Sequence, residues 1–156
     1  MSKAGLQAAN EYGQRLPKFD DAKAAERELI NAKDVSLAYL HAHYPTQLRY
    51  TVESLKEIEA WYFHCFENGN EVSGKLDRRR VERALAFYLG EVLVRGDSRY
   101  TWSIEPYAFL GGAFTIGVRR PGLRFDLMGF DDLWNTPNNK RRQSLYRKAQ
   151  QFLAHK

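Results

Sequence analysis

The histidines and the single cysteine are the first residues to consider for catalysis or metal binding. His41 and His43 are two positions apart in one predicted helix, and His64 and Cys65 are adjacent in another. Side chains at these spacings diverge on a helix surface. A zinc ion needs ligands that converge on one point, and a cysteine nucleophile needs a base within hydrogen-bond reach. We therefore expect no metal, no cofactor and no thiol catalysis.

Four carboxylates in the second half of the chain could gather around a divalent cation. They are Glu105, Asp126, Asp131 and Asp132. Asp131 and Asp132 directly precede the last predicted helix, where acidic side chains stabilise the helix start through its dipole. This structural role is the favoured interpretation, and an enzyme that uses these acids ranks last among the hypotheses.

Glu91 is the most informative single carboxylate. It follows Gly90 and flanks an apolar helical stripe, so it needs a hydrogen-bond donor if it is partly buried. The candidate donors are the indole of Trp102, the guanidinium of Arg95 and the backbone amides of a sheet. Glycine inside a helix costs about 1 kcal/mol relative to alanine, so Gly90 predicts the close approach of another element. A structural hydrogen bond of Glu91 is favoured over a functional acid, and no enzyme is predicted.

The positive charge of the chain is concentrated at its end. The formal net charge is +5 over 156 residues, yet residues 140–156 hold six basic side chains and no acidic one. This leaves 18 basic and 19 acidic side chains for residues 1–139. A local basic patch indicates an acidic partner surface.

The closing helix is expected over residues 136–154 and carries most of this charge. A partner-binding face and a solvated face are both compatible with its composition. The candidate partner-binding residues on or beside this helix are basic or aromatic: Trp134, Lys140, Arg141, Arg142, Tyr146, Arg147 and Lys148.

Hydrophobic periodicity predicts the elements that position these residues. Helices are expected over residues 2–16, from residue 20 or 21 to 43, and over 53–66, 77–95 and 136–154, and strands over 48–52, 99–105, 113–119 and 123–128. Asp20, Asp77 and Thr136 are the expected helix N-caps. Short turns between the last three strands favour an antiparallel meander. The prediction is an α+β protein, with N-terminal helices packed on a small antiparallel sheet and a C-terminal helix.

One domain is expected over residues 1–156, with a helical N-terminal segment at 1–45 and an α+β core at 46–156. A single cysteine excludes an intramolecular disulfide. The first residues do not form a signal peptide, and no apolar stretch approaches the ~20 residues that span a membrane. A cytoplasmic protein without a membrane partner is therefore expected, and its oligomeric state is left open.

Two stretches carry a resemblance to known proteins. They are residues 84–93, which contain Tyr88, Gly90 and Glu91 and precede Trp102, and residues 50–59. Together they resemble a loose group of small bacterial domains of unknown function, in which a Tyr-Leu-Gly-Glu helix precedes a strand with a tryptophan. The similarity covers about residues 48–128. Some members of the group resemble, or lie beside, immunity proteins of bacterial toxin systems.

This resemblance implies a non-catalytic protein-binding module, an immunity protein that binds and inhibits a cognate toxin. Tyr88, Gly90, Glu91 and Trp102 match the motif and are expected to be structural. The partner would be a toxin or another protein with an acidic surface. The alternative is a nucleic-acid-binding module that uses the basic C-terminal helix.

Overall fold

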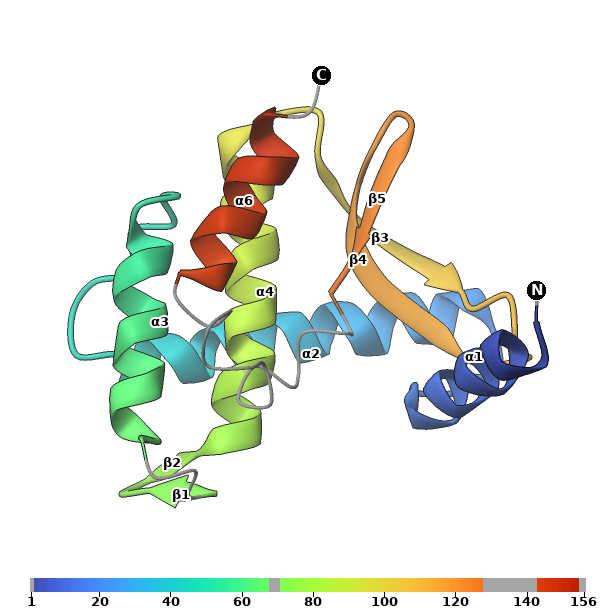
Figure 1. The fold of residues 1–156 in the computed structure, drawn as a ribbon, viewed down its shortest axis with the longest axis horizontal. Helices are drawn as coiled ribbons and strands as arrows, with labels where there is room; N and C mark the ends of the chain where they lie inside the picture. Colours follow the sequence, from blue (N-terminus) through green and yellow to red (C-terminus); the bar gives the residue numbers. More distant parts are fainter. Residues whose placement is uncertain (1, 68–70, 128–142, 155–156) are drawn as a thin grey trace.

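Helices and two small antiparallel sheets make up the structure, a computed structural model that describes residues 2–67, 71–127 and 143–154 (Figure 1). The helices are α1 (Lys3–Arg15), α2 (Ala22–His43), α3 (Ser54–Cys65), α4 (Arg78–Gly96) and α6 (Ser144–Ala154). The strands are β1 (Val72–Ser73), β2 (Leu76–Asp77), β3 (Thr101–Pro106), β4 (Phe114–Arg120) and β5 (Leu123–Asp126). The predicted α+β class is confirmed.

The larger sheet is the predicted meander. Its strands lie in the order β3-β4-β5 and both pairs are antiparallel. The smaller sheet is a β1–β2 hairpin that leads directly into α4, and the sequence did not predict it. None of the helices in the described ranges is long and apolar enough to cross a membrane.

Helix α4 forms the centre of the fold. Twelve of its 19 residues are buried, and a helix that is apolar nearly all round has to be covered on several sides. Helices α2, α3 and α6 and the larger sheet all contact it, and Figure 1 shows α3 on one side of α4 and the sheet on the other. Asp77 caps it as predicted, because its carboxylate accepts a hydrogen bond from the Arg80 amide at 3.0 Å.

Helix α2 packs on the sheet, as predicted for an N-terminal helix. Ala25 and Leu29 form one apolar cluster with Phe87 of α4 and with Phe114 and Ile116 of β4. The N-cap of α2 is Asp21, which accepts from the Ala24 amide at 2.8 Å. The prediction that Asp20 caps this helix is therefore wrong by one residue.

The strand expected over residues 48–52 is wrong, because this segment pairs with no strand. Tyr50 has a φ of 55°, a left-handed conformation that is uncommon for a bulky residue. Its amide donates to the Tyr88 hydroxyl at 3.0 Å, and the two rings stack with centroids 4.8 Å apart. A tertiary contact with α4 therefore overrides the local strand pattern.

The last helix begins later than predicted. Gln143 has a φ of 54°, so a continuous helix over residues 136–154 is wrong and α6 begins at Ser144. Thr136, the expected cap, lies outside the described residues. The cap comes instead from α3, where the Glu59 carboxylate accepts from the Ser144 amide at 3.0 Å, the Ser144 hydroxyl at 2.5 Å and the Leu145 amide at 3.2 Å.

We expect Glu59→Ala to lower the free energy of unfolding by about 1–3 kcal/mol, because the first amides of α6 would lose a buried acceptor. Urea denaturation followed by circular dichroism measures this change. Glu57→Ala is the matched control, since Glu57 is an exposed carboxylate on the same helix. Equal losses in the two variants would show that the Glu59 cap does not hold α6.

Candidate functional site

The motif residues of the sequence meet where α4 contacts the sheet. A Cβ atom on Gly90 would lie 2.5 Å from Cη2 of Trp102 and 2.6 Å from Cδ1 of Leu127, so only glycine admits this contact. The Trp102 indole donates to Glu91 at 3.0 Å, and the Arg95 guanidinium donates to the same carboxylate at 3.3 Å. The predicted close approach at Gly90 and both predicted side-chain donors to Glu91 are confirmed.

Tyr88, the fourth motif residue, is buried on the same helix. Its hydroxyl accepts a hydrogen bond from the Tyr50 amide and lies 2.6 Å from the Ser54 hydroxyl. Tyr88 therefore joins the start of α3 to α4, while Gly90 and Glu91 join α4 to β3. Through these contacts the four motif residues connect α3, α4 and β3.

We expect Gly90→Ala to destabilise the protein by about 1–3 kcal/mol through overpacking, although alanine is the better helix former. Gly111→Ala should change stability little, because no atom would lie within 4 Å of its Cβ. Thermal or urea denaturation of the two variants measures the difference. A Gly90→Ala protein as stable as the wild type would mean that the sheet does not depend on this close contact.

The predicted partner-binding residues divide into three groups. Trp134, Lys140, Arg141 and Arg142 lie outside the described residues. Tyr146 packs against α3, where its ring lies under Lys56 at 4.1 Å and its hydroxyl donates to Glu53 at 3.2 Å. Arg147 and Lys148 lie on α6. Tyr146 is thus engaged within the fold, and α6 begins after the three predicted basic residues at positions 140–142.

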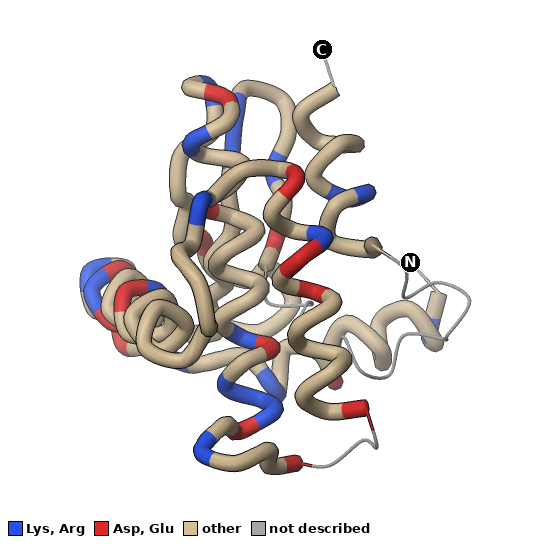
Figure 2. The backbone as a smooth tube through the Cα atoms, turned by 90° about the vertical axis from the view of Figure 1, so that its left-hand side faces the viewer, with Lys and Arg blue, Asp and Glu red and all other residues tan. Residues whose placement is uncertain are grey.

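A second basic surface lies at the start of α4, and the charge pattern of the sequence did not single it out. Arg79, Arg80 and Arg83 are exposed in its first two turns, and the first turn holds no acidic residue. Figure 2 shows lysine and arginine segments gathered where the β1–β2 hairpin leads into α4. The positive end of the helix dipole disfavours cations in the first turn, so the dipole gives Arg79 and Arg80 no support. Their contacts within the fold are the ion pair of Arg79 with Glu71 at 3.8 Å and the stacking of Arg80 on the Tyr39 ring.

At this end of α4 the exposed arginines lie beside apolar side chains of α2. The Arg80 guanidinium lies 4.1 Å from the centroid of the Tyr39 ring. A hollow of about 220 Å³ lies between α2 and α4, and its lining includes Val35, Tyr39, Arg80 and Arg83. We call Val35, Tyr39, Arg79, Arg80 and Arg83 the arginine surface.

Arg78, the first residue of α4, differs from the three exposed arginines because its guanidinium is hydrogen-bonded to carboxylates within the fold. It is buried and donates to Glu82 at 3.1 Å and to Glu71 at 2.7 Å. The Tyr62 hydroxyl donates to the same Glu82 carboxylate; burial and the hydrogen bond to Glu82 raise the pKa of Tyr62. Its neighbour Arg79 forms a longer ion pair with the same Glu71, at 3.8 Å. The run of three arginines after the Asp77 cap was the available signal in the sequence, but only the structure separates the buried member from the exposed ones.

The carboxylates suspected of metal binding have other partners. Glu105 pairs with Arg119 at 2.8 Å and with Arg124 at 2.6 Å, and Asp126 accepts from the Tyr12 hydroxyl at 3.3 Å. Asp131 and Asp132 lie outside the described residues. Within the described ranges, no three His, Cys, Asp or Glu side chains gather as a metal site would require.

Hydrogen bonding from Arg119 lowers the pKa of Glu105 from 4.5 to about 2. The unfolded chain therefore binds more protons than the folded one in this range, so the stability from the ionised Glu105 is present above pH 4.5 and is lost as the pH falls towards 2. We expect Glu105→Gln to lose less stability than the wild type over this fall in pH. Urea titrations at several pH values measure it, and parallel losses in both proteins would contradict the pairing.

The fold and this site define a small α+β protein with an exposed arginine surface at the start of its central helix. The chain belongs to the family described as "Uncharacterised protein YwmA", whose model matches residues 18–153. It is 28% identical over 123 residues to the "Uncharacterized protein YwmA" of Bacillus subtilis (strain 168), in a match that covers 77% of this chain and 78% of that protein. No solved structure matches the chain. The expected membership of a group of unknown function is confirmed, and the match extends to α2 and into α6, beyond the expected residues 48–128.

Proposed function

We propose that this protein is a non-catalytic protein-binding module and that the arginine surface receives an acidic region of its partner. The observation that carries this proposal is the exposure of Arg79, Arg80 and Arg83 side by side in the first two turns of α4, where the helix dipole disfavours positive charge in the first turn. Exposed charges that the helix dipole does not stabilise are compatible with a role outside the fold.

The composition of the arginine surface supports a protein partner. Val35 is 51% exposed, and Tyr39 and Arg80 lie stacked beside it. Tyrosine and arginine are the residue types that most often dominate binding energy in protein interfaces. An acidic partner side chain could pair with Arg83 while an apolar one covers Val35.

The finer form of the proposal is an immunity protein that binds and inhibits a cognate bacterial toxin. The resemblance of residues 48–128 to a group with such members supports it. A toxin-like protein encoded beside the gene is the partner to test first. Co-expression and pull-down of the two proteins is the direct test, and absence of any complex with that partner would remove the immunity role.

Charge reversal tests which surface binds that partner. We expect Arg80→Glu and Arg83→Glu each to weaken binding at least tenfold, since each would replace attraction to an acidic surface by repulsion. Arg27→Glu is the matched control, because Arg27 is an exposed arginine on α2 outside the arginine surface. Isothermal titration calorimetry with the partner measures the three affinities.

The predicted C-terminal surface is tested in the same assay with Arg147→Gln and Lys148→Gln. Loss of binding in these two variants and not in the α4 variants would move the binding site to α6. Nucleic acid is the alternative partner for either surface. Electrophoretic shifts of DNA and RNA that weaken steeply with salt would favour it.

A further inference from the structure

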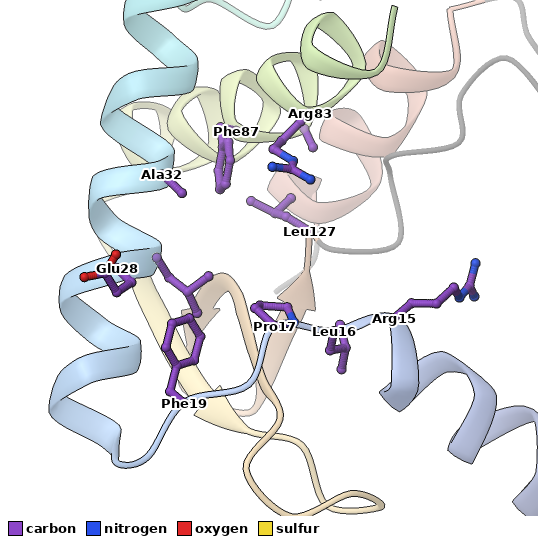
Figure 3. A pocket seen from close by; sticks show the side chains of 11 residues that line it. Arg15, Leu16, Pro17, Phe19, Glu28, Ala32, Arg83, Phe87 and Leu127 are labelled. Carbon is purple, nitrogen blue, oxygen red and sulfur yellow. The ribbon is translucent and has the colours of Figure 1, made fainter.

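A larger hollow lies on the other side of Arg83. It encloses about 400 Å³ between the α1–α2 connection, α2, α4 and the residue after β5 (Figure 3). Its walls are mainly apolar and include Leu16, Phe19, Leu29, Phe87 and Leu127. This volume falls within the range of small-molecule sites, which are typically apolar clefts with a few polar groups.

The walls of this hollow are held in place by the rest of the fold. The Phe19 amide donates to the Gly112 carbonyl at 2.8 Å, and the Phe114 amide donates to the Pro17 carbonyl at 3.1 Å. These bonds fasten the α1–α2 connection to β4. Leu29 and Phe87, on the opposite side, are buried in the cluster between α2 and the sheet. The hollow is therefore preformed.

Of the three charged side chains that line the hollow, two are engaged elsewhere. Glu28 pairs with Arg27 at 3.4 Å, and Arg15 lies over the Tyr12 ring at 5.7 Å. In Figure 3 both point away from the hollow, while the Arg83 guanidinium lies at its edge beside Leu127. Arg83 has no ion pair, hydrogen bond or ring contact with any other described residue.

We propose that this hollow binds a small amphipathic anion, a single apolar chain that ends in an oxyanion. The chain would lie against Leu29, Phe87 and Leu127, and the head group would accept hydrogen bonds from Arg83. A guanidinium pairs two parallel N–H groups with the two oxygens of a carboxylate or phosphate. Burial of each methylene adds affinity, so the chain and the head group both contribute to the affinity.

Four probes separate the contributions of chain and head group. Octanoate has the chain and a carboxylate, and octyl phosphate has the same chain with a phosphate. Octanol has the chain without an anionic head group, and acetate has the carboxylate without the chain. Titration calorimetry of the full chain should show binding of octanoate, octyl phosphate or both, weaker binding of octanol and none of acetate. The stronger of the two anions identifies the head group.

Three variants test the site itself. Arg83→Gln should weaken binding of the preferred anion about tenfold, through loss of a charge-assisted hydrogen bond, and leave octanol binding unchanged. Ala86→Leu should weaken both, because Ala86 lines the hollow and leucine would fill it. Arg79→Gln is the control, since Arg79 is exposed on the same helix but lies outside the hollow. Circular dichroism melting confirms that each variant is folded.

Two results would overturn the proposal. One is the absence of binding for both anionic probes. The other is an equal effect of Arg83→Gln on the anion and on octanol, which would remove Arg83 as the head-group ligand. If Ala86→Leu does not fold, the comparison of anion with octanol in Arg83→Gln still decides. Because Ala86 lies outside the arginine surface, a ligand lost in Ala86→Leu with partner binding retained would separate this site from the protein-binding role.

Discussion

The contact of Gly90 with Trp102 and Leu127 is the constraint on which the rest of the structure depends. It brings the sheet onto α4 at a distance that no side chain at position 90 would permit. From Val81 to Leu93, every residue except Arg83 and Glu91 is buried. Glu91 accepts a hydrogen bond from the Trp102 indole at the same contact. In the first half of α4, the side chains that remain outside the core are therefore Arg79, Arg80 and Arg83.

Burial of α4 on several sides requires that its polar groups be satisfied internally, because an unpaired buried charge is costly. Glu82 is 1% exposed and meets this requirement through Tyr62 and Arg78. Glu59 does the same on α3 by capping α6, and burial raises the pKa of its carboxyl. The inner polar groups thus build the fold, whereas Arg79, Arg80 and Arg83 are exposed.

Local signals made much of this fold predictable. The cap at Asp77, the purpose of Gly90, the donors to Glu91 and the meander all follow from residues close in sequence or from one strong pattern. The strand prediction at Tyr50 failed because the backbone there is held by a hydrogen bond to Tyr88, 38 residues away. The start of α6 was misplaced because its capping carboxylate lies on another helix. The net charge per segment singled out the C-terminal residues. In residues 1–139 the acidic side chains balance the α4 arginines in the charge count, although the arginines lie together on the surface.

The central proposal is that Arg83, an exposed cation near the start of α4, serves an external anion and not the fold. Urea denaturation of Arg83→Gln measures this most directly, because Arg83 has no partner in the described part of the chain and lies exposed in the second turn of α4. We expect its free energy of unfolding to equal that of the wild type or to exceed it by up to about 0.5 kcal/mol. A loss of about 1 kcal/mol or more would show that Arg83 is a structural residue and would contradict the claim.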